Sequence, residues 1–168
     1  MQENSGKSIE QLISDLGSDD GMVRQRARYA LTQLGEPAVD ALIRAFQEKN
    51  NPTHYEAAKT LSGIGSTKAI ATFINALQDE DFSVRWVAAE GLISIGEPSI
   101  RPLLRAMELH AESGRLREGV HHVLHDWITR KLIDEQMRKI LSPILDAYRN
   151  FEPAAATRLA AIEASNQL

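Results

Sequence analysis

The chain repeats one arrangement of apolar and polar positions along most of its length. Apolar or small residues recur at positions i, i+4, i+8 and i+11, a spacing that places them on one face of a helix. The four copies of this stripe begin at Val23, Thr53, Val84 and Leu116. Their third positions are Leu31, Leu61, Leu92 and Leu124, which are 30, 31 and 32 residues apart. A period of this size is typical of proteins built from stacked helical repeats.

A second apolar pattern precedes each stripe and predicts a first helix, so that each repeat is a pair of helices. It consists of two large apolar residues followed, after a short gap, by a third. The copies are Leu12-Ile13/Leu16, Leu42-Ile43/Phe46, Phe73-Ile74/Leu77, Leu103-Leu104/Met107 and Ile144-Leu145/Tyr148.

The residues between these patterns favour turns and helix ends. Gly35, Gly65 and Gly96 follow the second helices, where a left-handed C-cap is expected. Pro37 and Pro98 fall where first helices begin. The polar linkers 18–21 and 79–81, together with Asn50-Asn51-Pro52, are predicted to cap the helices that follow them.

The C-terminal part carries a looser fifth copy of the pattern. Its predicted stripe is Phe151, Ala155, Leu159 and Ile162. Residues 128–139 are extra relative to the other repeats, and we expect an elongated helix followed by a break near Asp134. The prediction is one all-α domain, a right-handed α-solenoid of about five antiparallel helix pairs. It has a disordered N-terminus over residues 1–8, four repeats over 9–127 and a C-terminal extension over 128–166.

Composition narrows the classes of function. A net charge of −4 and a pI of about 5.7 argue against a nucleic-acid-binding protein, which needs a basic surface. The absence of cysteine excludes disulfides, thiolate zinc sites and cysteine nucleophiles. The sequence shows no secretory signal and no apolar run long enough to span a membrane. We therefore expect a soluble cytoplasmic protein with no membrane partner.

The repeat resembles a known family. Residues Asp79–Gly96 consist of an acidic turn and then the pattern Val-Arg-x-x-Ala-Ala-x-x-Leu-x-x-Ile-Gly. This combination is similar to the short HEAT repeats named after phycobilisome lyases. The resemblance covers residues 9–127 closely and 128–166 loosely. It implies that the second helices line a concave, partner-facing surface. Such repeats occur in scaffolds, in bilin lyases and in iron hydroxylases, but the hydroxylases use His-Glu pairs and this chain has no His-Glu dipeptide.

The helical rotation of 100° per residue selects the side chains that point out of that surface. Tyr29, Tyr55 and Trp86 are three of the few aromatic residues, and tyrosine and tryptophan dominate the energetics of interfaces. The predicted partner-binding residues are Tyr29, Tyr55, Lys59, Trp86, Val87, Glu90, Glu118 and His122. We interpret the chain as a non-enzymatic scaffold for a protein partner, itself a monomer or weak homodimer. The alternatives are a bilin-lyase-like subunit or chaperone, and incidental packing of the aromatic residues.

An arginine column and a group of histidines can each be explained by a structural role. Arg24, Arg85 and Arg117 lie beside the buried stripes and can tie each helix to its preceding linker; His54 replaces arginine in the second repeat. His121 and His125, at i and i+4, share a helix face and could bind a metal with His110. We favour the interpretation that His121 and His125 fill the junction with the C-terminal segment, and no cofactor is predicted.

Overall fold

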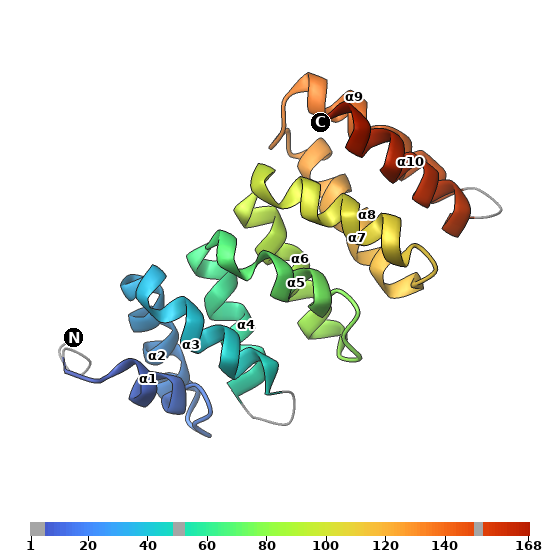
Figure 1. Ribbon diagram of the computed structural model, residues 1–168. Coiled ribbons are helices and arrows are strands. Elements are labelled where there is room, and N and C mark those ends of the chain that lie inside the picture. The colour runs from blue at the N-terminus through green and yellow to red at the C-terminus, as the bar shows by residue number, and fades with distance from the viewer. Residues whose placement is uncertain (1–5, 49–52, 150–152) are drawn as a thin grey trace. The chain divides into compact units, whose positions relative to one another are not determined.

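The computed structural model describes residues 6–48, 53–149 and 153–168, and these residues form ten α-helices and two short 3₁₀ helices (Figure 1). The all-α class and the succession of about five helix pairs are thereby confirmed. The helices are α1 (Ile9–Asp15), α2 (Gly21–Leu34), α3 (Glu36–Gln47), α4 (Thr53–Ile64), α5 (Ile70–Ala76), α6 (Phe82–Ile95), α7 (Ile100–His110), α8 (Gly114–Thr129), α9 (Glu135–Ala147) and α10 (Pro153–Gln167), with η1 (Thr67–Ala69) and η2 (Glu97–Ser99) between them.

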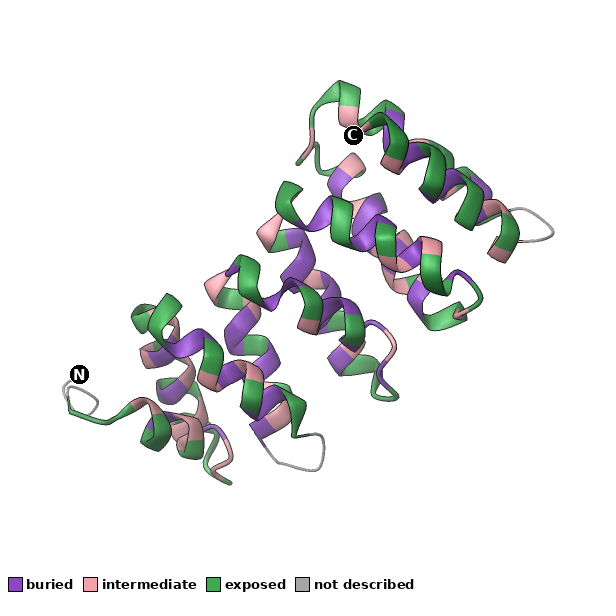
Figure 2. Ribbon diagram, viewed as in Figure 1, coloured by how far each residue is buried: buried purple, intermediate pink, exposed green. Residues whose placement is uncertain are grey.

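The chain divides into two compact units, Met1–Ala69 and Ile70–Leu168, which we call the first and the second unit. In the first unit α1 packs on α2, and α3 and α2 both pack on α4. In the second unit α6 packs on α5 and α8, while α10 packs on α7 and α9. Buried positions lie where helices face one another within a unit (Figure 2). All four anchor leucines of the repeat, Leu31, Leu61, Leu92 and Leu124, are buried as the stripe predicts.

The acidic linkers start the second helices as expected. Asp20 accepts a hydrogen bond from the Met22 backbone N–H at 2.8 Å, and Asp81 accepts one from Ser83 at 2.7 Å. These carboxylates satisfy N–H groups that have no partner inside the helix. The break near Asp134 is also confirmed, since α8 ends at Thr129 and Asp134 caps α9. The predicted caps at Asn50-Asn51-Pro52 lie outside the described residues.

The glycines that end the second helices adopt a conformation that differs from the predicted one. Their φ angles are positive, as expected, at 67° for Gly35 and 76° for Gly96. The ψ angles are −131° and −140°, so the backbone is the mirror image of an extended residue and not a left-handed helical cap. This region is open essentially to glycine alone, and it explains why the turn uses that residue.

The arginine column ties helices to their linkers. Arg24 Nη1 donates to the carbonyls of Ser18 and Asp19, at 2.7 and 3.1 Å. Arg85 does the same to Asp79 and Glu80, at 2.9 and 3.0 Å. In the fourth repeat Arg117 donates to the Ala111 carbonyl, and in the second the His54 ring contacts the Phe46 carbonyl through Nδ1. The predicted structural role of the arginines is confirmed, because each donates hydrogen bonds to carbonyls of the preceding linker.

The predicted stripe of the last helix is wrong. Leu159, Ile162 and Ala155 are exposed, and Phe151 lies outside the described residues. The buried side chains of α10 are small, namely Thr157, Ala160, Ala161 and Ala164. Because α10 packs against both α7 and α9, small residues on this face allow the helices to approach closely.

Candidate functional site

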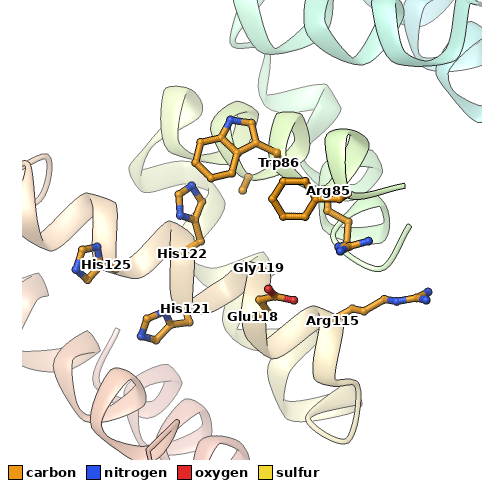
Figure 3. Close-up of a pocket in the computed structure, with 10 residues that line it drawn as sticks. Arg85, Trp86, Arg115, Glu118, Gly119, His121, His122 and His125 are labelled. Atoms are coloured by element: carbon orange, nitrogen blue, oxygen red, sulfur yellow. The ribbon is translucent and has the colours of Figure 1, made fainter. Parts of the chain in front are cut away.

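The second unit contains an open cavity of about 380 Å³ between α6 and α8 (Figure 3). A cavity of this size falls within the range of about 300–1,000 Å³ found for small-molecule sites. The lining residues are Phe82, Arg85, Trp86, Ala89, Arg115, Glu118, Gly119, His121, His122 and His125.

Two small residues, one on each helix, form part of the lining. Ala89 is buried on α6, and Gly119 belongs to α8. A Cβ at Gly119 would lie only 2.9 Å from Cδ2 of Leu77, so any larger residue would push α8 away from the segment that follows α5. The absence of a side chain at Gly119 therefore lets α8 pack closely against Leu77.

Aromatic rings form one wall of the cavity. The Trp86 side chain is 47% exposed, and its ring lies 4.5 Å from the His122 ring between centroids. Phe82, one helical turn before Trp86, lies 6.3 Å from it. The Nε2 atom of His122 is 3.4 Å from a carboxylate oxygen of Glu90, which holds the imidazole against the indole. Neighbouring rings of this wall are tilted by 36° and 37° to each other, and together they give the cavity an aromatic side.

Two guanidinium groups lie at one end of this wall. The Cζ atom of Arg85 is 5.4 Å from the centroid of the Phe82 ring, a cation–π contact. Arg115 contacts the Gln78 carbonyl at 3.5 Å, the outer limit of a hydrogen bond, so its remaining donors stay available. Figure 3 shows both arginines at the end opposite His125, with Glu118 between them and the histidines. Guanidinium donors favour carboxylates as partners.

The histidines lie at the other end. The His121 ring is 4.7 Å from the ring of Tyr148, which follows α9, and 6.0 Å from the His125 ring. The interpretation that His121 packs against the C-terminal segment is thereby supported by contact. The Nδ1 atom of His110 lies 3.9 Å from Oε1 of Glu112, and His110 does not line the cavity. Within residues 6–48, 53–149 and 153–168, no group of three or more histidine, aspartate or glutamate side chains is placed to hold a metal ion.

We expect the second unit to lose stability as the pH falls below 6.5, the ordinary pKa of histidine. Burial lowers the pKa of His121 in the folded chain, and positive charge on His125 and Arg149 lowers it further. The unfolded chain therefore binds a proton at His121 at a higher pH than the folded chain does. This contribution to stability is complete above pH 6.5 and decreases as the pH falls toward the folded pKa.

The measurement is the urea midpoint above and below pH 6.5 for the wild type, His121→Gln and His110→Gln. His121→Gln should reduce the loss at low pH, while His110→Gln, on an exposed side chain, should keep it. An identical loss in all three proteins would contradict the assignment to His121.

Most of the second-unit residues predicted for partner binding belong to this site. Trp86, Glu118 and His122 line the cavity, and Glu90 lies behind His122. The prediction for Val87 is wrong, because this side chain is only 8% exposed. Its helix packs on both α5 and α8, so a second stripe of α6 is buried beside the one that the repeat predicts.

The remaining predicted residues lie in the first unit, on α2 and α4. Tyr29 is 69% exposed, and Tyr55 is exposed with Lys59 Nζ 6.0 Å from the centroid of its ring. None of these three side chains belongs to the cavity lining.

Sequence reasoning missed Phe82 and Arg115 as residues of the cavity, and it missed the contact of Arg85 with the Phe82 ring. Phe82 stands four positions before Trp86, and Arg115 stands four positions before Gly119. Extending each outward column by one helical turn toward the N-terminus would have found both.

Comparison with known proteins gives a consistent result. A family model described as HEAT repeats matches residues 9–74 and 53–125. The chain is 33% identical over 105 residues to phycocyanobilin lyase subunit alpha of a Nostoc species, covering 55% of this chain and 37% of that protein. The same subunit of Microchaete diplosiphon is 30% identical over 95 residues, covering 51% and 32%.

These relatives are considerably longer than the aligned region, since the chain spans about a third of their length. Their activity and partners therefore do not transfer as a whole. Among the residues that the structure describes, no helix combines the length and apolar character needed to cross a membrane.

Proposed function

Since the chain belongs to the HEAT-repeat family, we propose that it is a bilin-lyase-like subunit whose α6–α8 cavity holds an open-chain tetrapyrrole. The observation that carries this function is the presence of an aromatic wall and two guanidinium groups in one cavity. The relatives named phycocyanobilin lyase subunit alpha supply the ligand class.

The chemistry of such a ligand matches the lining. An open-chain tetrapyrrole has a conjugated, nearly flat body and carries propionate side chains. The body can pack on the exposed indole of Trp86, against which the His122 ring lies with 4.5 Å between centroids and a tilt of 37° between the planes. The propionates can accept hydrogen bonds from Arg115 and Arg85 at the end of the aromatic wall.

Glu118 and the histidines would complete the contacts. A carboxylate at Glu118 can accept hydrogen bonds from pyrrole N–H groups, which are donors in this ligand class. His121, His122 and His125 can donate to carbonyl oxygens at the ends of the ligand. In this function the chain binds and orients the tetrapyrrole, and groups on a partner subunit carry out any covalent step.

The test is titration of the purified chain with phycocyanobilin, followed by visible absorption and by quenching of tryptophan emission. We expect Trp86→Ala to weaken binding by about tenfold, corresponding to about 1.4 kcal/mol of lost stacking. Arg115→Gln should weaken it by about tenfold or more, since charge-assisted hydrogen bonds contribute roughly 1.5–3 kcal/mol each.

The matched control is Tyr29→Ala, which removes an exposed aromatic side chain in the other unit and should leave tetrapyrrole binding unchanged. The proposal fails if the wild type binds no phycocyanobilin. It also fails if Trp86→Ala and Arg115→Gln both bind as the wild type does.

A further inference from the structure

The second helices of the first unit carry a local surplus of positive charge. Four cations, Arg24, Arg26, Arg28 and Lys59, stand on α2 and α4 against a single carboxylate on these helices, Glu56, which gives a formal charge of +3. Asp19 and Asp20, in the linker directly before α2, reduce the local surplus to +1. The whole chain carries −4, so the residues outside these two helices together carry −7. The sign of the charge on α2 and α4 is thus opposite to that of the chain.

The single carboxylate is already paired. Arg28 Nη1 donates to Glu56 Oε2 at 2.5 Å, and Arg24 Nε lies 3.4 Å from Oε1. The Glu56 side chain is only 13% exposed, while both arginines keep more of their surface in solvent. Two cations around one carboxylate leave one positive charge in excess within this cluster.

These guanidinium groups are also held in place. Arg24 donates through Nη1 to the carbonyls of Ser18 and Asp19, at 2.7 and 3.1 Å, in addition to its contact with Glu56. Side chains that are already ordered lose little conformational entropy when an anionic group binds them. The cluster is therefore a preorganised anion-attracting surface.

Exposed aromatic side chains accompany this charge. Tyr29 is 69% exposed on α2, and Tyr55 is exposed on α4, which packs against α2. The two helices approach closely near Gly63, where a Cβ would lie 3.6 Å from Oγ1 of Thr32. Lys59 Nζ lies 6.0 Å from the centroid of the Tyr55 ring, so cation and aromatic ring form one contact patch.

We propose that the exposed face of α2 and α4, formed by Arg24, Arg28, Tyr29, Tyr55 and Lys59, binds an acidic segment of a partner protein. Carboxylates of the segment contact the cations, and its apolar or aromatic side chains pack on the two tyrosines. Tyrosine and arginine are the residues that most often dominate binding energy at interfaces, and both occur here.

The charge distribution favours a short acidic segment over a nucleic acid. A long polyanion would experience the −7 of the remaining chain as well as the +3 of α2 and α4. A short segment responds only to charges within a Debye length, about 8–10 Å at physiological salt. The local surplus therefore attracts an acidic peptide although the protein as a whole is acidic.

This surface lies in the first unit and the tetrapyrrole cavity in the second, so the inference goes beyond the proposed function and does not rest on it. The two can be tested independently with variants that each change only one unit.

The probe is a fluorescein-labelled peptide that repeats Glu-Glu-Tyr-Leu, titrated with the full chain and followed by fluorescence anisotropy. The wild type should bind this peptide more tightly than a version with lysine in place of glutamate, and added salt should weaken the binding. The double variant Tyr29→Ala/Lys59→Gln should bind about tenfold more weakly, which is about 1.4 kcal/mol.

Two control variants sharpen the test. Lys68→Gln removes an exposed lysine of the same unit that pairs with Glu36 at 3.2 Å and lies on η1, outside the proposed face. Trp86→Ala removes an aromatic side chain of the second unit. Both should bind the peptide as the wild type does, and all variants should show the wild-type helical circular dichroism and melting temperature.

The inference is overturned if the acidic and lysine peptides bind equally, or if Lys68→Gln weakens binding as much as the double variant does. Tighter binding of an oligothymidylate of equal charge would identify a nucleic-acid surface and would equally overturn it. Titration of the double variant with phycocyanobilin separates the two proposals. If this variant loses peptide binding but still binds phycocyanobilin, the substitutions affect the first-unit surface alone.

Discussion

Replacing Trp127 with alanine should lower the free energy of unfolding of the second unit by about 3–5 kcal/mol. The indole is 0% exposed, and it is among the largest fully buried side chains of the described chain. Its Nε1–H donates to the Ile93 carbonyl at 3.4 Å, so truncation removes a hydrogen bond between α8 and α6 and also leaves a cavity. Urea unfolding followed by circular dichroism measures the loss as a shift of the midpoint.

The control for this prediction is the other tryptophan of the chain. Trp86 is 47% exposed, and its truncation should change the free energy of unfolding by about 0.5 kcal/mol or less, as for most surface substitutions. Emission spectra distinguish the two variants, since loss of the buried Trp127 should remove the blue-shifted component. Equal destabilisation by Trp86→Ala and Trp127→Ala would contradict the burial described for Trp127.

Local rules were enough to predict the repeats and their helix ends. The leucines were found from the apolar period within each helix, and the aspartate caps and the positive φ of Gly35 depend on residues within about one helical turn. Arg24 and Arg85 were equally predictable, since each reaches the linker five and six residues before it. Contacts over such short distances along the chain can be predicted from the order of the residues alone.

Where a helix packs against helices that are distant in the sequence, the face that becomes buried could not be predicted in the same way. In α10 alanines surround the helix, so the apolar period fits more than one face. The structure buries Ala160, Ala161 and Ala164, because α7 and α9 require small residues at close approach, and it leaves Leu159 in solvent. Val87 is buried for a similar reason, since α6 has helices on two sides and buries more than one stripe of residues.

The candidate site shows the same division between local and distant information. Rotation about the helix axis was sufficient to place Trp86, Glu118 and His122 on outward columns, and these three residues line the cavity. The cavity itself depends on how α6 and α8 meet, which no single repeat encodes. Arg85 was assigned only its linker contacts, although its guanidinium also reaches the Phe82 ring at the cavity edge.

Replacing Gly91 with alanine should destabilise the second unit, although glycine-to-alanine changes usually stabilise helices. A Cβ at Gly91 would lie 2.6 Å from Cε2 and Cζ of Phe73, a ring that is itself fully buried between α5 and α6. Overpacking of a well-filled core costs about 1–3 kcal/mol and outweighs the usual helix gain of about 0.5–1 kcal/mol. Urea unfolding should therefore show a lower midpoint for Gly91→Ala.

Gly63 is the matched control, because it is also a glycine within a second helix. Its nearest neighbours are Oγ1 and Cγ2 of Thr32, at 3.6 and 3.7 Å from an added Cβ, which is ordinary van der Waals contact. Gly63→Ala should therefore stabilise the first unit by about 0.5–1 kcal/mol. The two variants are expected to change stability in opposite directions, and a stabilising Gly91→Ala would mean that the Phe73 ring can move aside. Because Phe73 packs on α6 at this position, the sign of the Gly91→Ala effect directly tests how closely α5 and α6 approach.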